Sequence, residues 1–278
     1  MSKVEGKVAL TGADGKLGQQ LRPALLGLGI KLRAAGGYGP LTPLQADEEV
    51  CHGNLCDSAV VDQLLQGVDV VVHLAGTSVE RPLPEVIENN LLALYELYEG
   101  ARRHGVKRVV LASSNHAIGM HSVETRLSLG CEFRPDGFYG LSKMWGEGMA
   151  RMYWDKHGIE SICLRIGSAE EKPTMLRHLS TWLGYEDLLH LVMQSISVPD
   201  LGFQLVWGVS NNRRSYWDNS GAERLGYRPV QDAEDYAAEI LKQVNPLDPI
   251  AQTYQGGGFV TLDFTPVDQR PSNTRTDK

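Results

Sequence analysis

Apolar runs of strand length alternate with segments of helical periodicity along the first 168 residues. The runs are nearly continuous rather than broken by polar residues, which is typical of parallel strands buried on both faces. They lie at residues 7–12, 30–36, 68–76, 107–114 and 159–168, and the helical patterns between them lie at 17–29, 58–67, 82–105 and 138–158. Alternating strands and helices build βαβ units. The pattern therefore predicts an α/β fold with a Rossmann-type doubly wound parallel sheet.

The alternation ends after about residue 168. Beyond it, the sequence has helical patterns at 179–196 and 219–229, a strand pattern at 203–210 and a last amphipathic helix at 233–244. We expect three parts: a core over residues 1–168, a small and mostly helical C-terminal region over 169–266 packed on the core, and a disordered polar tail over 267–278.

Charge and composition narrow the class of protein. The 278 residues include 27 Lys and Arg against 34 Asp and Glu, which gives a formal charge of −7 without a basic cluster. This charge argues against nucleic acid or an anionic membrane as a partner. The apolar runs are too short to span a membrane, and the N-terminal residues lack the features of a signal peptide. We therefore expect a cytoplasmic enzyme that acts on a small molecule.

The four cysteines, Cys51, Cys56, Cys131 and Cys163, show no C-x-x-C spacing, and in a reducing compartment they would stay free thiols. Cys51, His52 and Cys56 could be imagined as metal ligands. No second ligand pair follows nearby, so we expect no metal.

A glycine-rich loop separates the first strand from the first helix. In TGADGKLG, the residues Gly12, Gly15 and Gly18 fall at this turn. Residues without side chains let the backbone approach a pyrophosphate, whose charge then lies at a helix N-terminus. A tight turn alone could also explain the glycines, but their position between strand and helix favours phosphate binding. The loop therefore predicts that residues 1–168 bind a dinucleotide. Because the alternation of strands and helices ends after residue 168, we expect residues 169–266 to cover the substrate.

The end of the second strand lacks an expected acid. Dinucleotide enzymes usually place Asp or Glu about 20 residues beyond the glycines, where it binds the hydroxyls of the adenosine ribose. Here Gly36 stands at that position. Arg33 and Lys16 could meet the 2′-phosphate of NADP, although Arg33 lies within the strand. The choice between NAD and NADP therefore stays open.

Tyr139 and Lys143 are four residues apart in the predicted helix 138–158, so they share one of its faces. A tyrosine hydroxyl, with an ordinary pKa of about 10, is a poor base near neutrality. A neighbouring ammonium group and an oxidised nicotinamide would both lower that pKa. Such pairs also occur by chance on exposed helices. Of the serines that end strand 107–114, we expect Ser114 rather than Ser113 to hold the substrate oxygen, because only one of them can face the cofactor.

The order of these motifs resembles the extended branch of the short-chain dehydrogenase/reductase superfamily: TGADGKLG, then HLAG at 73–76, ASSN at 112–115 and the tyrosine–lysine pair. The resemblance implies hydride transfer with NAD or NADP, with Tyr139 as base and Lys143 and Ser114 as the other catalytic residues. It also implies cofactor contacts from Gly12, Gly15, Lys16, Leu17, Gly18, Gly36, Asn54, Leu55, Leu74, Ala75, Gly76, Tyr139, Lys143 and Ile166.

The chain is similar to uronate dehydrogenases over nearly its whole length, as shown by the further stretches SSNHAIG, RPDGFYGLSK, LRIGS, LSTWL and VWGVSNN. This resemblance implies oxidation of C1 of a cyclic hexuronate such as galacturonate or glucuronate to an aldarolactone with NAD, in a homo-oligomer. Arg177 would bind the carboxylate through two parallel hydrogen bonds. The implied substrate contacts are Ser78, Ser114, Asn115, His116, Ser168 and Arg177.

Some positions depart from the family pattern. Met120 and His121 stand where the family has aromatic residues, and Asn54 stands where it usually has Asp. Another aldose or acidic sugar is therefore an alternative substrate. A nucleotide-sugar epimerase would share the glycine loop and the tyrosine–lysine pair, but the roughly 110 residues after residue 168 are few for a nucleotide-binding region. A non-catalytic dinucleotide sensor is the third alternative, and the intact catalytic set argues against it.

Overall fold

Seven parallel strands form the central sheet. The computed structural model describes residues 6–37, 39, 41–243 and 248–270, and within them the strand order is β3-β2-β1-β4-β5-β6-β9. The strands are β1 (Lys7–Thr11), β2 (Lys31–Gly36), β3 (Glu49–His52), β4 (Val70–His73), β5 (Arg108–Ser114), β6 (Glu160–Ile166) and β9 (Phe203–Gly208). The order reverses between β1 and β4, where doubly wound sheets bind ligands at the carboxyl ends of the strands. The predicted α/β Rossmann-type fold is confirmed.

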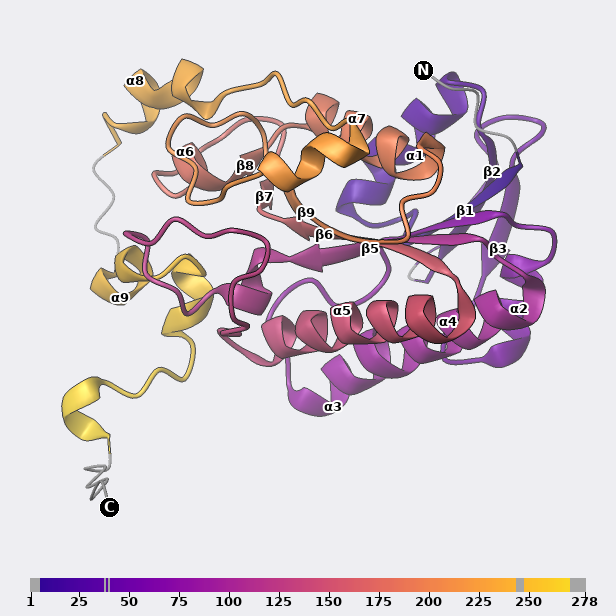
Figure 1. The fold of residues 1–278 in the computed structure, drawn as a ribbon, viewed down its shortest axis with the longest axis horizontal. Coiled ribbons are helices and arrows are strands. Elements are labelled where there is room, and N and C mark those ends of the chain that lie inside the picture. The colour runs from indigo at the N-terminus through magenta and orange to yellow at the C-terminus, as the bar shows by residue number, and fades with distance from the viewer. Residues whose placement is uncertain (1–5, 38, 40, 244–247, 271–278) are drawn as a thin grey trace.

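Helices cover both faces of the sheet. The helices α1 (Lys16–Gly27) and α7 (Tyr185–Ser197) lie on one face, and α2 (Ser58–Leu65), α4 (Ala93–His104) and α5 (Phe138–His157) lie on the other (Figure 1). Val8 and Leu10 of β1 point into the core on the α1 side, and Ala9 points into the core on the α5 side. In the described part of the chain, no helix is long and apolar enough to cross a membrane.

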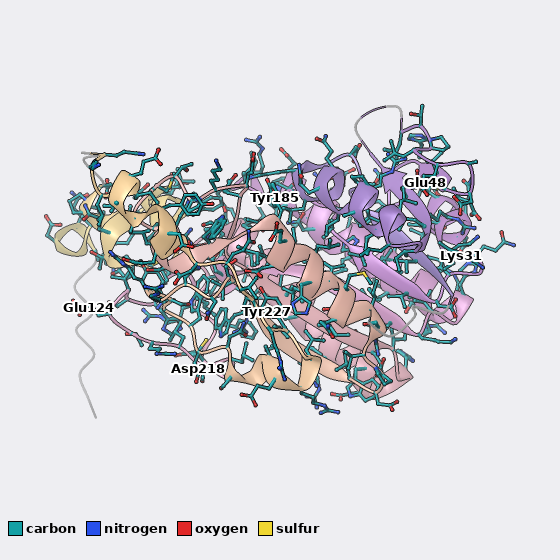
Figure 2. All side chains as sticks on the ribbon, turned by 90° about the horizontal axis from the view of Figure 1, so that it is seen from above. Lys31, Glu48, Glu124, Tyr185, Asp218 and Tyr227 are labelled. Atoms are coloured by element: carbon teal, nitrogen blue, oxygen red, sulfur yellow. The ribbon has the colours of Figure 1, made fainter. Side chains whose placement is uncertain are left out.

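Two contacts hold the layer of α1 and α7 against the sheet. Arg22 of α1 forms a buried ion pair with Glu48, with 2.6 Å between Nε and Oε1. Tyr227 packs into the core beside α7, and its hydroxyl donates to the carbonyl oxygen of Val209 (2.9 Å). Figure 2 looks onto this layer and shows Glu48 near α1 and Tyr227 near α7. The ion pair of Arg22 fixes α1, whose first turn follows the glycine loop.

One long helical segment precedes β5. The helix α3 (Leu83–Val86) continues through a π-helical turn (Ile87–Leu92) into α4, within the predicted helix 82–105. The amide of Asn90, in the π turn, accepts a hydrogen bond from the backbone nitrogen of Thr77 (2.7 Å) and donates one to Ser142 Oγ (2.8 Å). Turns of this kind occur often at functional sites. Asn90 thereby connects the segment after β4 to α5.

The C-terminal region differs from the prediction at residues 179–196. The expected helix 179–196 is divided into α6 (His178–Thr181), the strand β8 (Trp182–Leu183) and α7. β8 pairs with β7 (Ser168–Ala169) and both of its side chains are buried, so tertiary pairing overrides the helical pattern. The predicted strand 203–210 is confirmed as β9. β3, with one fully buried residue, has no apolar run that would predict it.

Short helices complete the fold. The expected last helix at 233–244 corresponds to the 3₁₀ turn Ala233–Tyr236 and to α8 (Ala237–Ile240), but α9 (Pro249–Thr253) follows it, contrary to the prediction. Asp248 caps α9 and a proline begins it, and its five residues are too few for a periodic pattern. The division at residue 168 stays a prediction, and residues 271–278 of the predicted tail lie outside the described residues. The short helical elements that complete the fold are α8 (Ala237–Ile240), α9 (Pro249–Thr253) and the 3₁₀ turns Asn115–Ile118, Ser220–Leu225, Ala233–Tyr236, Gly257–Thr261 and Val267–Gln269.

A buried ion pair joins α5 to the sheet. Glu147 of α5 and Arg165 of β6 are both almost fully buried, with 2.8 Å between Oε2 and Nη2. Ser113 of β5 donates to Oε1 of Glu147 (2.6 Å), and Nη1 of Arg165 donates to the carbonyl oxygen of Leu129 (3.2 Å). Buried charges are tolerated when they are paired and hydrogen-bonded in this way. The network fixes the rotation of α5 about its own axis.

Candidate active site

A cavity of about 760 Å³ lies at the carboxyl ends of β1, β4, β5 and β6. Every residue predicted to contact the cofactor lines this cavity. Their individual roles stay predictions. Of the predicted substrate contacts, Asn115 does not line the cavity, whereas Ser78, Ser114, His116, Ser168 and Arg177 do.

Two glycines of the loop are required by its geometry. Gly12 has a φ of 66°, and a Cβ there would fall 2.8 Å from the backbone nitrogen of Ala75. A Cβ on Gly18 would fall 2.1 Å from the carbonyl oxygen of Gly12. The loop therefore packs backbone against backbone and leads directly into the N-terminus of α1. This cradle fits the pyrophosphate of a dinucleotide, which backbone N–H groups and the positive end of the helix would bind.

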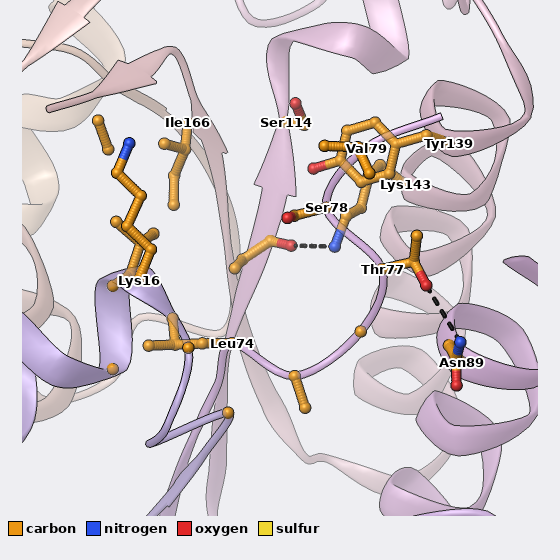
Figure 3. A pocket seen from close by; sticks show the side chains of 18 of the residues that line it. Lys16, Leu74, Thr77, Ser78, Val79, Asn89, Ser114, Tyr139, Lys143 and Ile166 are labelled. Atoms are coloured by element: carbon orange, nitrogen blue, oxygen red, sulfur yellow. Dashed lines mark hydrogen bonds between the residues drawn. The ribbon is translucent and has the colours of Figure 1, made fainter. Parts of the chain in front are cut away.

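Tyr139 and Lys143 face the cavity from α5, across from Lys16 and Ile166 (Figure 3). The ammonium of Lys143 donates to the carbonyl oxygen of Ala112 (2.9 Å) and lies 5.4 Å from the centre of the Tyr139 ring. Burial lowers the pKa of Lys143 to about 8. Near neutrality, Lys143 therefore keeps most of its positive charge beside the tyrosine.

The pKa of Tyr139 moves in the direction opposite to the prediction. Burial raises it to about 12, and a hydrogen bond with Ser114 offsets this only in part. The expectation that the neighbouring ammonium lowers this pKa is wrong for the protein by itself, because desolvation of the phenolate is the larger effect. The protein alone therefore keeps Tyr139 protonated at neutral pH.

Ser113 and Ser114 point to opposite faces of β5, as alternation along a strand requires. Ser114 lines the cavity and accepts a hydrogen bond from the backbone nitrogen of His116 (3.2 Å). Ser113 is bound to Glu147 on the other face. Of the two hydroxyls, the one at Ser114 is therefore placed to meet a substrate.

Glu80 caps the helix that carries the tyrosine. Gly137, the N-cap residue of α5, has no side chain to bind the first backbone N–H groups. The carboxylate of Glu80 accepts from the backbone nitrogens of Phe138 (2.8 Å) and Tyr139 (3.0 Å) instead. In the same segment, Thr77 Oγ1 accepts from the Asn89 amide (3.1 Å; Figure 3). The start of α5 is thereby fixed to the segment that carries Ser78.

Neutral hydrogen-bond acceptors hold the guanidinium of Arg177 at the cavity. Its Nη1 donates to Ser168 Oγ (2.9 Å), and its Nε and Nη2 donate to the carbonyl oxygen of Gln255 (3.0 and 2.8 Å). With the amide of Asn115 oriented to satisfy both neighbours, its oxygen accepts from Nη2 of Arg177 (2.7 Å) and its nitrogen donates to the carbonyl oxygen of Ile166 (3.1 Å). Asn115 therefore holds Arg177 in place from behind the cavity wall.

Arg177 makes no direct ion pair with an Asp or Glu among the residues that the structure describes. The buried carboxylate of Asp136 is the negative charge that attracts it, and this carboxylate is bound to His116. Burial lowers the pKa of Arg177 from its ordinary value, but a guanidinium stays charged in proteins. A buried cation normally needs a counter-charge. The cavity is thus electrostatically suited to a ligand with a carboxylate.

His116 is held from two sides. Its Nδ1 lies 2.6 Å from Oδ2 of Asp136, and the ring of Phe259 stacks on the imidazole with 3.9 Å between the ring centres. The side chain of Asp136 is fully buried, and its Oδ1 has no hydrogen-bond partner among the described residues. A carboxylate that accepts from Nδ1–H leaves Nε2 free to accept a hydrogen bond from a ligand.

Several other candidates lie outside the cavity. Met120 and His121 do not line it, and His121 Nε2 contacts the carbonyl oxygen of Glu132 (2.8 Å). Arg33 is bound to Glu49 and to backbone carbonyl groups of α2, so it is not available for a 2′-phosphate. Cys51 is buried in the core. In the described residues, no cluster of His, Cys, Asp or Glu could hold a metal ion.

Comparison with known proteins identifies the family. The profile of the NAD dependent epimerase/dehydratase family matches residues 8–173. A uronate dehydrogenase of Pseudomonas putida is 41% identical over 91% of this chain and 95% of its own. The chain belongs to the uronate dehydrogenases of this family.

Solved uronate dehydrogenases share the fold of this chain. One from Agrobacterium tumefaciens, a tyrosine-to-alanine mutant complexed with NAD, has a TM-score of 0.88 at 40% identity, covering 95% of this chain and 99% of that one. A glucuronic acid dehydrogenase from Chromohalobacter salexigens has a TM-score of 0.87 at 39% identity, covering 92% and 97%. The family and enzyme class predicted from the motifs are confirmed.

The motifs of the uronate dehydrogenases did not reveal every residue of the site. Two residues that were not predicted line the cavity, Asp14 and Phe259. Three more that were not predicted bind residues of the site: Glu80 caps the helix of Tyr139, Asp136 contacts His116 and Gln255 accepts from Arg177. Asp14 lies inside the glycine loop, where its carboxylate could have been noticed. The other four reach the site through contacts with segments distant in sequence, for which no local pattern exists.

Gly257 tests whether the position of Arg177 matters. Gly257 has a φ of 63°, and a Cβ there would fall 2.6 Å from Cδ of Arg177. Gly257→Ala should therefore displace the guanidinium and lower kcat/KM for a uronate by at least about tenfold, with unchanged NADH binding. Gly258→Ala is the matched control, because a Cβ there meets no atom within 4 Å. Equal kinetics for the two variants would contradict the proposed importance of Arg177.

Proposed function

We propose that the protein oxidises the C1 hydroxyl of a cyclic hexuronate to an aldarolactone with NAD. The observation that carries this proposal is the cation of Arg177, which faces the cavity without an ion-pair partner among the described residues. In a hexuronate pyranose the carboxylate is carried by C5, which the ring oxygen separates from C1, so one molecule has a carboxylate for Arg177 and a C1 hydroxyl for Tyr139. The names of the relatives, uronate dehydrogenase and glucuronic acid dehydrogenase, support the same substrate class.

The residues near C1 have separate roles in moving its hydroxyl proton. In the protein alone Tyr139 is protonated, and the positive charges of bound NAD and of Lys143 would favour its phenolate by releasing that proton to solvent. The phenolate then takes the proton of the C1 hydroxyl, and Ser114 orients the same oxygen through a hydrogen bond. When bound, NAD accepts the hydride that leaves C1. Lys143 donates to a ribose hydroxyl of the cofactor and keeps positive charge near the phenolate. Because the sugar ring is already closed, the product leaves as a lactone and no hydrolytic residue is required.

The residues at the far end recognise the sugar acid. Arg177 and Ser168 bind the carboxylate, and the adjacent hydroxyl groups of the ring are met by Ser78 and His116. Asp136 keeps Nδ1 of His116 protonated, so that Nε2 accepts from a sugar hydroxyl. In this proposal Asn115 positions Arg177 rather than touching the substrate.

A substrate panel tests the proposal directly. The protein is mixed with NAD and either uronates or neutral aldoses, and NADH is followed by absorbance. We expect NADH to accumulate with uronates, whereas an epimerase would return the hydride to the sugar and accumulate none. Arg177→Ala should lower kcat/KM on uronates by at least about tenfold, because a charge-assisted hydrogen bond is lost, and leave neutral aldoses nearly unchanged.

Arg177→Lys is the matched control, since it keeps the charge but loses the two-pronged geometry and should fall between the wild type and Arg177→Ala. NADH binding to each variant reports whether the fold is intact. Equal losses on uronates and neutral aldoses would mean that Arg177 does not bind a carboxylate.

Tyr139→Phe tests the base. Removing the hydroxyl leaves the ring and its packing in place but abolishes proton transfer at C1. Turnover should fall by at least about a hundredfold, while the Kd for NADH changes little. The two quantities are measured by steady-state kinetics and by fluorescence titration. Turnover within a few-fold of the wild type would exclude Tyr139 as the base.

Lys143 sets an alkaline limit on cofactor use. Because its pKa is lowered to about 8, the ammonium form is present below pH 8 and is lost as the pH rises through that value. The kcat/KM for NAD, which reports groups of the free enzyme, should therefore decline above about pH 8. Lys143→Arg stays charged throughout and should remove this decline. An identical decline in the variant would assign it to another group.

We also propose that the enzyme acts in the cytoplasm as a homo-oligomer. The four cysteines are free thiols in the structure, which supports a reducing compartment. The formal charge of −7 supports a small-molecule substrate rather than nucleic acid or an anionic membrane. The homo-oligomeric state rests on the family resemblance.

A further inference from the structure

A carboxylate from the glycine loop fills the space beside the end of β2. Gly36 stands where dinucleotide enzymes usually have the acid that binds the adenosine ribose. A Cβ on Gly36 would fall 2.8 Å from Oδ2 and 2.9 Å from Cγ of Asp14. These distances are comparable with the length of an aspartate side chain. The Asp14 carboxylate therefore occupies the region that an aspartate at position 36 would reach.

Hydrogen bonds fix Asp14 at this position. Its Oδ2 accepts from the backbone nitrogen of Gly37 (3.0 Å), immediately after β2. Next to it, the backbone nitrogen of Ala13 donates to the carbonyl oxygen of Ala35 (3.0 Å), which joins the glycine loop to the strand. Asp14, Gly36 and Gly37 all line the cavity. The carboxylate is thus held at the cavity wall rather than left to rotate in solvent.

The cations that could favour a 2′-phosphate are engaged elsewhere. Lys16 forms an ion pair with Glu170, and Arg33 is bound to Glu49 and to backbone carbonyl groups of α2. Asp14 contacts the end of β2, whereas Lys16 lines the cavity as one half of its ion pair with Glu170.

We propose that Asp14 replaces the missing acid of β2 and selects NAD over NADP. Its carboxylate accepts hydrogen bonds from the 2′- and 3′-hydroxyls of the adenosine ribose, for which an ionised carboxylate is a strong acceptor. The same charge repels a 2′-phosphate, which carries a charge of about −1.5 to −2 at neutral pH. Repulsion of the wrong ligand is a common source of specificity. This inference rests on the dinucleotide site of the proposed function, but not on the identity of the sugar.

Binding of reduced cofactors without sugar tests the assignment. The Kd values for NADH and NADPH are measured by fluorescence titration on the wild type, Asp14→Asn and the double variant Asp14→Ala with Gly36→Asp. The wild type should bind NADH at least about tenfold more tightly than NADPH. Asp14→Asn keeps the size of the side chain but removes its charge, so the preference should fall by about tenfold.

The double variant returns a carboxylate to the end of β2. The nearest atoms to a Cβ on Gly36 all belong to Asp14, so replacing Asp14 with alanine makes room for the new side chain. It should restore the NADH preference. Asp155→Asn, which removes an exposed charge on α5, is the control and should leave the preference unchanged.

Two outcomes would overturn the assignment. If the ratio of the Kd for NADPH to the Kd for NADH is the same in Asp14→Asn as in the wild type, Asp14 does not bind the ribose hydroxyls. Equal weakening of both cofactors would show that Asp14 only maintains the loop. By contrast, a wild type that binds neither cofactor would contradict the proposed function itself, and one that binds NADH but oxidises no uronate would leave the cofactor assignment standing while rejecting the substrate.

Discussion

The carboxylate of Glu147 and the guanidinium of Arg165 meet in the interior, where loss of either partner would leave a buried charge and cost on the order of 3–5 kcal/mol. Tyr139, Lys143 and Glu147 follow one another at intervals of four along α5, so they lie on the same stripe of the helix. Anchoring the third of these residues to β6 therefore directs the other two to the carboxyl edge of the sheet. The acid/base pair depends on an ion pair that touches neither cofactor nor substrate.

The two ends of the cavity are built by different means. The cofactor end is made largely of backbone, with glycines at the turn after β1 and hydrogen bonds from that turn to β2. The sugar end is made of side chains drawn from β5, from the segment before α6 and from the C-terminal 3₁₀ turn. Its central charge, Arg177, donates hydrogen bonds to neutral oxygen atoms, and the negative charge that attracts it is the buried carboxylate of Asp136.

The sequence could predict the features that depend on local pattern. The apolar runs located six of the seven strands of the main sheet, and the glycine loop and the spacing of Tyr139 and Lys143 located the cavity. It could not predict features that depend on contacts between distant segments, such as the cap that Glu80 supplies to α5 or the pairing that turns 182–183 into a strand. The raised pKa of Tyr139 in the protein without NAD could not be predicted for the same reason, because the spacing shows the neighbouring ammonium but not the depth of burial.

The contact between Arg177 and the carbonyl oxygen of Gln255 has a consequence for the order in which the site is assembled. On the ribosome, the glycine loop and the strands β1 to β6 are synthesised well before Gln255 and Phe259. N-terminal portions of a chain generally begin to fold first during synthesis. This side of the cavity is therefore complete only once residues 255–259 have been synthesised, because a shorter chain would lack both the acceptor that anchors Arg177 and the ring that stacks on His116.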